Sequence, residues 1–356
     1  MKIMKGMVAV AMSGGVDSSV AAALLKEKGY KVIGLTMRLN PAEITAKNPS
    51  CFGSSGIEDA RRVCRRLGIR HYVLDFNKDF SEKVIRNFYK EYLSGRTPNP
   101  CVRCNQFIKF NVLLKKSIAL GAEFLATGHY ARIVKSKQGL LLKKARDLKK
   151  DQSYFLYTLK QEQLKHIILP LGSLTKPQVR RLAFDFKLNV AQKRDSQEIC
   201  FLPGGGHGDL IKEKNGKVSP GNFVNNEGKV MGQHRGIPFY TIGQRHGLRI
   251  AAKFPLYVTK INPRNNLITV GEKKEAYKKT FFVKDLRLNK PIKKKVEIKV
   301  RIRYNHKESP AFVCPVGNLL KIAFKKPQFA ITPGQSAVFY DKEIVLGGGI
   351  IQKVVD

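Results

Sequence analysis

A glycine-rich loop between an apolar run and a helix-like segment is the feature that most constrains the fold of this chain. Residues 7–12 (MVAVAM) predict a buried strand, the loop reads SGGVDSS over residues 13–19, and residues 18–28 carry apolar side chains at helical spacing. A glycine turn from strand to helix points backbone N–H groups and the positive end of the helix dipole at one place. The pattern therefore predicts an α/β domain with a phosphate or pyrophosphate site at this loop.

The residues of the loop indicate how a phosphate would be held. Its serines supply hydroxyl donors, and Asp17 can help to hold a metal ion. The lysine-bearing loop GxxxxGK[ST] is absent from the sequence, so backbone and hydroxyl groups would bind the phosphate. An enzyme that splits ATP into AMP and pyrophosphate needs such a site. The alternative is a glycine turn that merely starts a helix.

The rest of the sequence indicates three regions. Strands expected at 31–37, 71–76 and 123–127 alternate with helices expected at 57–67, 79–93, 106–120 and 175–189, the last capped by Thr175 with Pro177 in its first turn. This alternation predicts a doubly wound parallel sheet over residues 1–203. A glycine-rich hinge at 202–208 leads to a small β-rich central domain (204–275). A C-terminal β-barrel (276–356) follows, and its clearest strand is 296–304.

The charge of the chain favours a polyanionic partner. Its 356 residues include 66 Lys and Arg against 27 Asp and Glu, a formal charge of +39. Part of such an excess is often a solvated surface, but an excess this large favours nucleic acid. A membrane surface is disfavoured because no long basic amphipathic segment has a strong apolar face. No apolar run approaches the roughly 20 residues that span a bilayer, and the N-terminal apolar run is too short for a signal peptide, so we expect a cytoplasmic protein.

The spacing of the cysteines points to chemistry rather than to a disulfide scaffold. Cys101 and Cys104 follow two prolines in TPNPCVRCN (97–105), which predicts a fixed loop. Cys104 would then lie just before a helix and beside Arg103, and both features lower the pKa of a thiol. Cys200 ends DSQEIC just before the hinge. An ATP-activating loop together with two loop cysteines fits sulfur transfer, in which one thiol carries a persulfide and the other helps to release its sulfur.

The remaining cysteines are assigned no chemistry. Cys64 and Cys314 are expected in the core, and Cys51 stays ambiguous.

The loop SGGVDSS resembles the signature of the N-type ATP pyrophosphatases, which adenylate a carbonyl or amide oxygen. Further blocks resemble the bacterial tRNA-specific 2-thiouridylases: TPNPCVRCNQFIKF (97–110), ATGHYAR (126–132), KDQSYFLY (150–157), DSQEICF (195–201), GQHRGIPFYTIGQRHGL (232–248) and AITPGQSAVFYD (330–341). These blocks run in order over nearly the whole chain. The resemblance implies adenylation of the carbon-2 oxygen of a wobble uridine in tRNA, then replacement of that oxygen by sulfur.

The resemblance also implies roles for individual residues. Cys200 would carry the persulfide and Cys104 would be the second catalytic cysteine, and the two could form a disulfide after sulfur has left. ATP, with Mg²⁺, would be surrounded by Ala11, Met12, Ser13, Gly14, Gly15, Val16, Asp17, Ser18, Met37 and Gly128. Asn99, Pro100 and Cys101 would face the target base. Contacts to tRNA would come from His129, Lys150, Asp151, Gln152, Arg303, Tyr304 and Gln335. Taken singly, His129 would be a satisfied loop histidine, and Lys150 and Arg303 would be solvated charges. Within ATGHYAR, after a strand, the functional interpretation of His129 is preferred.

Cys101 departs from the pattern because some relatives carry Asp at this place. Cys101, Cys104 and Cys200 could converge to hold an iron–sulfur cluster or an adventitious zinc ion. We place the persulfide route first, expect no resident metal beyond Mg²⁺ and keep the cluster as the alternative. The expected partners are tRNA and a cysteine desulfurase or sulfur-relay protein.

Two rival functions remain open at this point. One is an amide-forming ATP pyrophosphatase that acts on a small metabolite, which would need neither the charge nor the cysteine pair. The other is a basic RNA-binding module without activity, against which the intact SGGVDSS loop argues.

Overall fold

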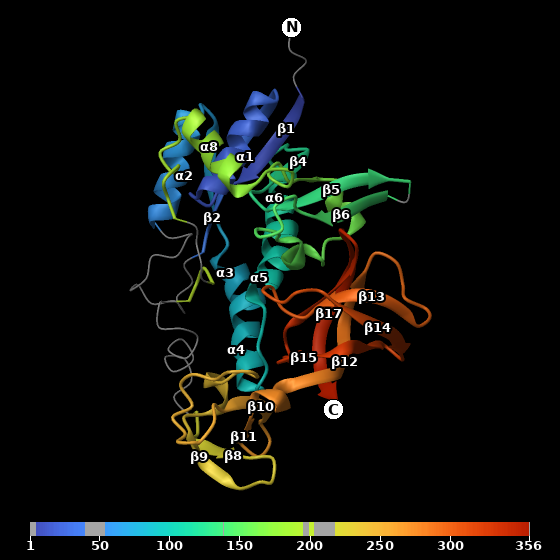
Figure 1. Cartoon of the computed structure of the whole chain (residues 1–356). Helices are drawn as coiled ribbons and strands as arrows, with labels where there is room; N and C mark the ends of the chain where they lie inside the picture. Colours follow the sequence, from blue (N-terminus) through green and yellow to red (C-terminus); the bar gives the residue numbers. More distant parts are fainter. Residues whose placement is uncertain (1–4, 40–53, 138, 195–198, 203–217, 356) are drawn as a thin grey trace. The chain divides into compact units, whose positions relative to one another are not determined.

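The computed structural model describes residues 5–39, 54–137, 139–194, 199–202 and 218–355 (Figure 1). The chain forms two compact units. The first comprises Met1–Val84, Pro100–Gly204 and Glu343–Val345, and the second comprises Ile85–Asn99, Gly205–Lys342 and Leu346–Asp356. None of the helices that the structure describes has the length and apolar character needed to span a bilayer.

A five-stranded parallel sheet is the centre of the first unit. Its strand order is β3-β2-β1-β4-β7. The strands are β1 (Lys5–Ala11), β2 (Tyr30–Arg38), β3 (Arg70–Asp75), β4 (Phe124–Ala126) and β7 (Ile167–Ile168). The chain passes from β1 outward through β2 to β3 and then returns to the other side of β1 as β4. The sheet therefore has a topological switch point between β1 and β4, where open α/β sheets bind ligands.

The remainder of the first unit is mainly helical. Its helices are α1 (Val16–Glu27), α2 (Ser54–Arg66), α3 (Asn77–Phe80), α5 (Pro100–Arg103), α6 (Leu114–Ala119), α7 (Gln161–Leu164) and α8 (Lys176–Asp185). Between them lie two π-helical stretches, η1 (Ser81–Ile85) and η2 (Cys104–Leu113), and the 3-10 turn η3 (Ser153–Leu156). The helix capped by Thr175 is confirmed: the side chain of Gln178 closes a capping box, and a proline lies in the first turn.

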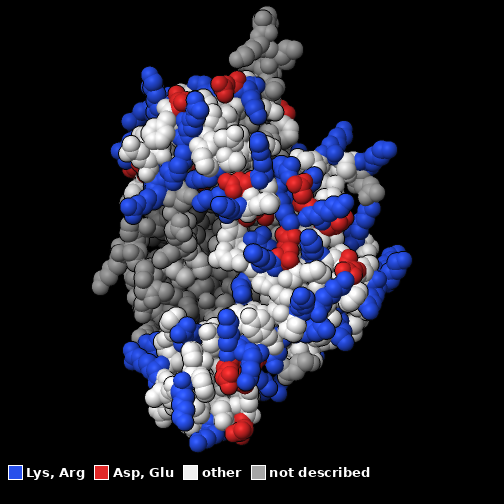
Figure 2. All heavy atoms as spheres, in the orientation of Figure 1, with Lys and Arg blue, Asp and Glu red and all other residues white. Residues whose placement is uncertain are grey.

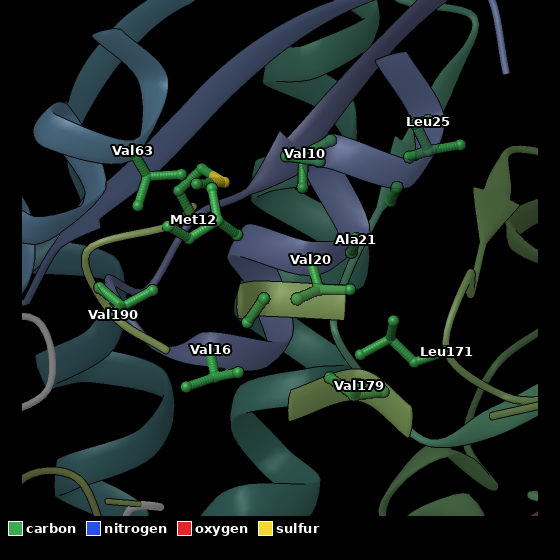
Figure 3. Packing of buried hydrophobic residues seen from close by; sticks show 14 of the residues in the cluster. Val10, Met12, Val16, Val20, Ala21, Leu25, Val63, Leu171, Val179 and Val190 are labelled. Carbon is green, nitrogen blue, oxygen red and sulfur yellow. The ribbon is translucent and has the colours of Figure 1, made fainter. Parts of the chain in front are cut away.

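One apolar core joins α1, α2 and α8 to the sheet (Figure 3). Val10 and Met12 project from the end of β1 toward Val20 of α1, Val63 of α2 and Val179 of α8. Ala9 and Leu125, which point to the opposite face, are also fully buried. Since both faces of the sheet are covered, the predicted doubly wound architecture is confirmed.

One local prediction for this unit was wrong, and one element was missed. The helix expected to begin at residue 106 begins at Pro100, so Cys101 and Cys104 lie inside helical structure and not in a loop. Proline is favoured in the first turn of a helix because its missing N–H is not needed there. The hairpin of β5 (Ala131–Ser136) and β6 (Gly139–Lys144) was not predicted. Cys51 and the hinge from Pro203 onward lie outside the described residues.

The second unit holds the predicted β-rich regions. It includes α4 (Arg86–Leu93), the end of the helix expected at 79–93. A four-stranded sheet has the order β10-β11-β8-β9. Its elements are β8 (Gly221–Val224), β9 (Val230–His234), the turn η4 (Ile237–Phe239), β10 (Tyr257–Asn262) and β11 (Leu267–Gly271), and their core includes Phe223, Val258 and Ile268.

The last strands form the predicted barrel. They are β12 (Tyr277–Leu288, after the turn η5, Lys273–Ala276), β13 (Val296–Arg301), β14 (Ser309–Val316), β15 (Leu319–Phe329), β16 (Ser336–Asp341) and β17 (Ile344–Val355). Because β12 pairs with both β15 and β17, the sheet closes on itself around a buried core that includes Phe281 and Phe339. Strand β13 ends at Arg301, three residues before the predicted end. The domain limits at 203 and 275 stay predictions.

Candidate active site

The loop after β1 has the backbone of an anion site. Its Gly14 has φ +71°, and α1 begins at Val16 with Gly15 as N-cap, which offers no side chain to the first-turn N–H groups. The Ser18 hydroxyl accepts a bond from Ser13 N (3.2 Å) and donates to Gly15 O (3.1 Å), so the loop is closed by its own hydroxyls. Uncapped N–H groups at a helix N-terminus bind anions readily, so the loop has the backbone that the predicted phosphate site requires. Phosphate binding itself stays a prediction.

A pocket of about 160 Å³ opens at the switch point, beside this loop. It is lined by Ala11, Met12, Ser13, Asp17, Ser18, Leu35, Met37, Lys109, Thr127, Gly128, His129 and Gln152. Most residues predicted to surround ATP therefore lie together, while Gly14, Gly15 and Val16 shape the loop without lining the pocket. Sequence reasoning missed Leu35, Lys109 and Thr127. It placed His129 and Gln152 against tRNA, and they line the same pocket.

Gly128 makes the close approach of β4 to α1 possible. A Cβ atom at this position would lie 2.7 Å from Ser18 N and 2.8 Å from the carbonyl carbon of Asp17. These are backbone atoms that cannot rotate away. Gly128 therefore keeps one wall of the pocket in contact with the first turn of α1.

Asp17 is held by two partners that sequence reasoning missed. The ammonium of Lys176, whose side chain is only 9% exposed, lies 2.7 and 2.9 Å from the two carboxylate oxygens. The Tyr130 hydroxyl donates to Oδ1 at 2.7 Å. Asp17 was predicted to help hold a metal ion, and here both of its oxygens are engaged. Lys176 is 159 residues away in sequence, so no local pattern indicated the pair.

His129 is a neutral side chain of the pocket wall. Its Nδ1 is 2.7 Å from the Thr127 hydroxyl, and its ring lies 5.8 Å from that of Phe110. Burial, with the positive charge of Lys109 nearby, holds the pKa of His129 well below its ordinary value. The imidazole is therefore uncharged near neutral pH.

The ionisation expected for Cys104 was wrong in this structure. Cys104 is buried, and burial raises its pKa, against which only the charge of Lys109 acts. Arg103 was expected to lower this pKa, but its Nε donates to Lys83 O at 2.9 Å and its guanidinium stacks on Phe107. Because α5 begins at Pro100, Cys104 also lies a full turn inside the helix, away from the positive end of the dipole.

The other cysteines separate into two environments. Burial and the neighbouring Cys104 raise the pKa of Cys101 to about 11, so the two thiols are close neighbours on one helix. Cys200 is partly exposed in the same unit, and the next residue, Phe201, packs edge-on against Phe80. Within the described part of the chain, no three His, Cys, Asp or Glu side chains are arranged to hold a metal ion. Cys64 is a core residue, as expected, and burial raises its pKa to about 12. The same expectation was wrong for Cys314, which is only half-buried on β14 of the second unit.

Several residues predicted to contact tRNA have structural partners in the chain. Asp151 is buried, and its carboxylate accepts bonds from Ala145 N, Ser153 N and Ser153 Oγ at 2.8 to 3.2 Å. Its neighbour Gln152 accepts from Tyr130 N at 3.0 Å. Lys150 is partly exposed at the same turn. The prediction that these residues contact tRNA stays untested.

The second unit contains the remaining predicted contacts. Arg303 Nη1 donates to Phe329 O (3.1 Å) and Ala330 O (3.3 Å), and the guanidinium of Arg301 lies over the ring of Tyr304. Gln335 donates to Thr97 O (3.2 Å) and Pro98 O (2.9 Å) and so anchors the segment that leads to Asn99. These contacts define structural roles, and contact with tRNA remains a prediction for these residues.

Lysine and arginine dominate the face of the molecule shown in Figure 2, where acidic side chains are few and scattered. This distribution matches the formal charge of +39. A surface with this charge attracts polyanions and binds them less tightly as salt is added.

Comparison with known proteins identifies the family of the chain. Family models match in order: the tRNA methyl transferase HUP domain over residues 6–204, the tRNA methyl transferase PRC-barrel domain over 209–272 and the aminomethyltransferase beta-barrel domain over 278–351. The chain is 49% identical over 355 residues to the tRNA-specific 2-thiouridylase MnmA of Clostridium acetobutylicum, covering 97% of this chain and 99% of the relative.

Two further relatives carry the same name. They are those of Acetivibrio thermocellus (47% identical, covering 98% of this chain and 99% of the relative) and Carboxydothermus hydrogenoformans (48% identical, covering 97% of each). The family models bear methyltransferase names, whereas these full-length relatives are named as thiouridylases. Because the identity is high and extends over all three matched regions, the chain belongs to the family of the tRNA-specific 2-thiouridylases.

Proposed function

We propose that this chain catalyses the ATP-dependent 2-thiolation of a wobble uridine in tRNA. The observation that carries the proposal is the pocket at the switch point, whose wall joins the anion loop (Ser13, Ser18) to Lys109 of the cysteine-bearing helix. Family membership supports the reaction. The basic surface supports the substrate, because polyanion binding requires such a charge.

In the first half-reaction, the carbon-2 oxygen of uridine attacks the α-phosphorus of ATP, and pyrophosphate leaves. The uncapped N–H groups of α1 and the hydroxyls of Ser13 and Ser18 would bind the pyrophosphate portion. Mg²⁺ would neutralise phosphate charge, and it needs only one or two carboxylates because it keeps several waters. Asp17 is the carboxylate that lines the pocket, and it would have to share its oxygens with Lys176.

In the second half-reaction, sulfur replaces the activated oxygen. The terminal sulfur of a persulfide on Cys200 attacks carbon 2, and AMP leaves with the former uridine oxygen. The Cys104 thiolate then attacks the Sγ atom of Cys200, which releases 2-thiouridine and leaves a disulfide between the two cysteines. A thiol reductant must open this disulfide, and a cysteine desulfurase or relay protein must supply the next sulfur. Since the reaction needs the base outside the anticodon stack, the uridine would flip into the site.

The test is nucleoside mass spectrometry on unmodified tRNA incubated with the protein, ATP, Mg²⁺, a cysteine desulfurase and cysteine. We expect 2-thiouridine with the parent protein and none without ATP, or with Cys104→Ser or Cys200→Ser. Cys314→Ser, on strand β14 of the barrel, is the matched control and should retain activity. Product from Cys200→Ser at the parental rate would refute the persulfide role. Activity that required anaerobic iron–sulfur reconstitution would replace this mechanism with a cluster-based one.

A further inference from the structure

Lys109 lies at the junction of the nucleotide pocket and the cysteine pair, and the reaction described above assigns it no role. It is half-buried in η2 and lines the pocket together with Ser13, Ser18 and His129. Among the residues that the structure describes, none forms a hydrogen bond or an ion pair with its ammonium group. The ammonium of Lys176, by contrast, is neutralised by Asp17. Lys109 therefore brings an uncompensated positive charge to the pocket.

The π-helical geometry explains how Lys109 reaches the side of Cys104. The two residues are five positions apart, and in an α-helix such residues point roughly 140° away from each other. In a π-helix, the backbone N–H of residue i+5 bonds to the carbonyl of residue i, so residue i+5 lies about one turn above residue i. Cys104 and Lys109 both lie in the part of η2 before Phe110, whose backbone is not helical, and the π-helical geometry of that part places them on one side of the helix. In agreement, Lys109 is near enough to Cys101, Cys104 and His129 for its positive charge to lower the pKa of each.

We propose that Lys109 is a substrate-binding residue in both half-reactions: its ammonium contacts the phosphate of the adenylated uridine and stabilises the negative charge on Cys104. The inference rests on the proposed function. The loop before α1 already provides an anion site for pyrophosphate, without a lysine. The phosphate left near the cysteines after pyrophosphate departs is that of AMP, and it needs a cation. In P-loop enzymes a lysine of the glycine-rich loop itself contacts the phosphates. Here Lys109 would supply that positive charge from a different segment of the chain.

The first test measures nucleotide binding without tRNA or a sulfur donor, so failure of thiolation activity cannot obscure it. Calorimetric titration with AMP and, separately, with pyrophosphate would compare Lys109→Met, Lys109→Arg and the parent protein. We expect Lys109→Met to lower the affinity for AMP at least about tenfold, because a charge-assisted hydrogen bond is lost. The affinity for pyrophosphate should stay within about twofold of that of the parent protein. Lys115→Met is the matched control, since Lys115 is exposed just beyond η2. AMP affinity in Lys109→Met equal to that of the control would overturn the proposal.

The second test follows the thiol of Cys104 by alkylation with iodoacetamide over a range of pH. Cleavage after Arg103 separates Cys101 from Cys104, so mass spectrometry reads each thiol alone. In Lys109→Met, the half-maximal rate for Cys104 should move to higher pH with an unchanged plateau, and Lys109→Arg should restore the parental profile. A lowered plateau, or a change that Lys109→Arg fails to rescue, would indicate a packing role and refute the proposal. Lys109→Gln replaces Lys109→Met if circular dichroism shows that the latter is unfolded.

Discussion

The two adjacent glycines of the phosphate loop should respond very differently to alanine. Gly14 has φ +71°, and a Cβ atom there would lie 2.2 Å from the carbonyl oxygen of Gly56. The left-handed backbone costs an alanine roughly 1–2 kcal/mol, and the overlap with a backbone atom adds about 1–3 kcal/mol. Gly14→Ala should therefore lower the free energy of unfolding by about 2–5 kcal/mol.

Gly15→Ala is the matched control, because the same methyl group is added one residue away. Gly15 has φ −100° and ψ 166°, which alanine adopts freely, and its Cβ would meet only the Ser13 hydroxyl at 3.4 Å. Alanine is a poorer N-cap than glycine, but it also reduces the conformational freedom of the unfolded chain, and the two effects oppose each other. The net change in the free energy of unfolding should therefore stay within about 1 kcal/mol. Urea unfolding followed by circular dichroism measures both variants. Equal destabilisation would show that neither the backbone conformation nor the Gly56 contact at Gly14 matters.

Three further variants test other parts of the structure. Gly128→Ala should lower the affinity for ATP at least about tenfold in calorimetric titration, because the added methyl group overlaps backbone atoms and must separate β4 from α1. An unchanged affinity would contradict this expectation. The Arg96 guanidinium donates hydrogen bonds to Glu91 and to two backbone carbonyls at 2.6 to 3.0 Å. Arg96→Ala should therefore lower the free energy of unfolding in urea by about 2–4 kcal/mol. A decrease below about 0.5 kcal/mol would refute the stabilising role of these bonds. Burial and neighbouring arginines lower the pKa of His306 to about 4. The unfolded chain, with a pKa near 6.5, takes up a proton first as the pH falls, so stability should drop by about 1–2 kcal/mol between pH 6.5 and 4, and His306→Gln should remove that part of the slope.

Features that depend on the local backbone were predictable from the sequence. The strand, glycine loop and helix at residues 7–28 are present because the apolar pattern, the glycines and the helix start all lie within a few turns. The Thr175 cap is correct for the same reason. Pro100 carried a usable signal that was misread, since a proline marks a first helical turn as readily as a loop. The hairpin β5–β6 was missed because its short apolar runs at 133–134 and 140–142 were not recognised as strands.

Contacts that the topology creates were not predictable in this way. Lys176 meets Asp17 because α8 packs beside α1, and no pattern near either residue encodes that packing. Tyr130 reaches the same carboxylate because β4 lies next to β1 in the sheet. Sequence reasoning can therefore locate a phosphate loop but not the cations and hydroxyls that distant segments bring to it.

Cys104 shows why the electrostatics of a site cannot be taken from neighbours in sequence. Arg103 is adjacent, yet its charge is directed to Lys83 O and to the ring of Phe107. Lys109 is five residues away, which an α-helical pattern places on a different face from Cys104. The π-helical backbone of η2 instead places Lys109 on the same side of the helix as Cys104. The charge that acts on the thiol is therefore set by helix geometry, and an insertion or deletion that restored α-helical periodicity should separate the pocket cation from the cysteine without changing either side chain.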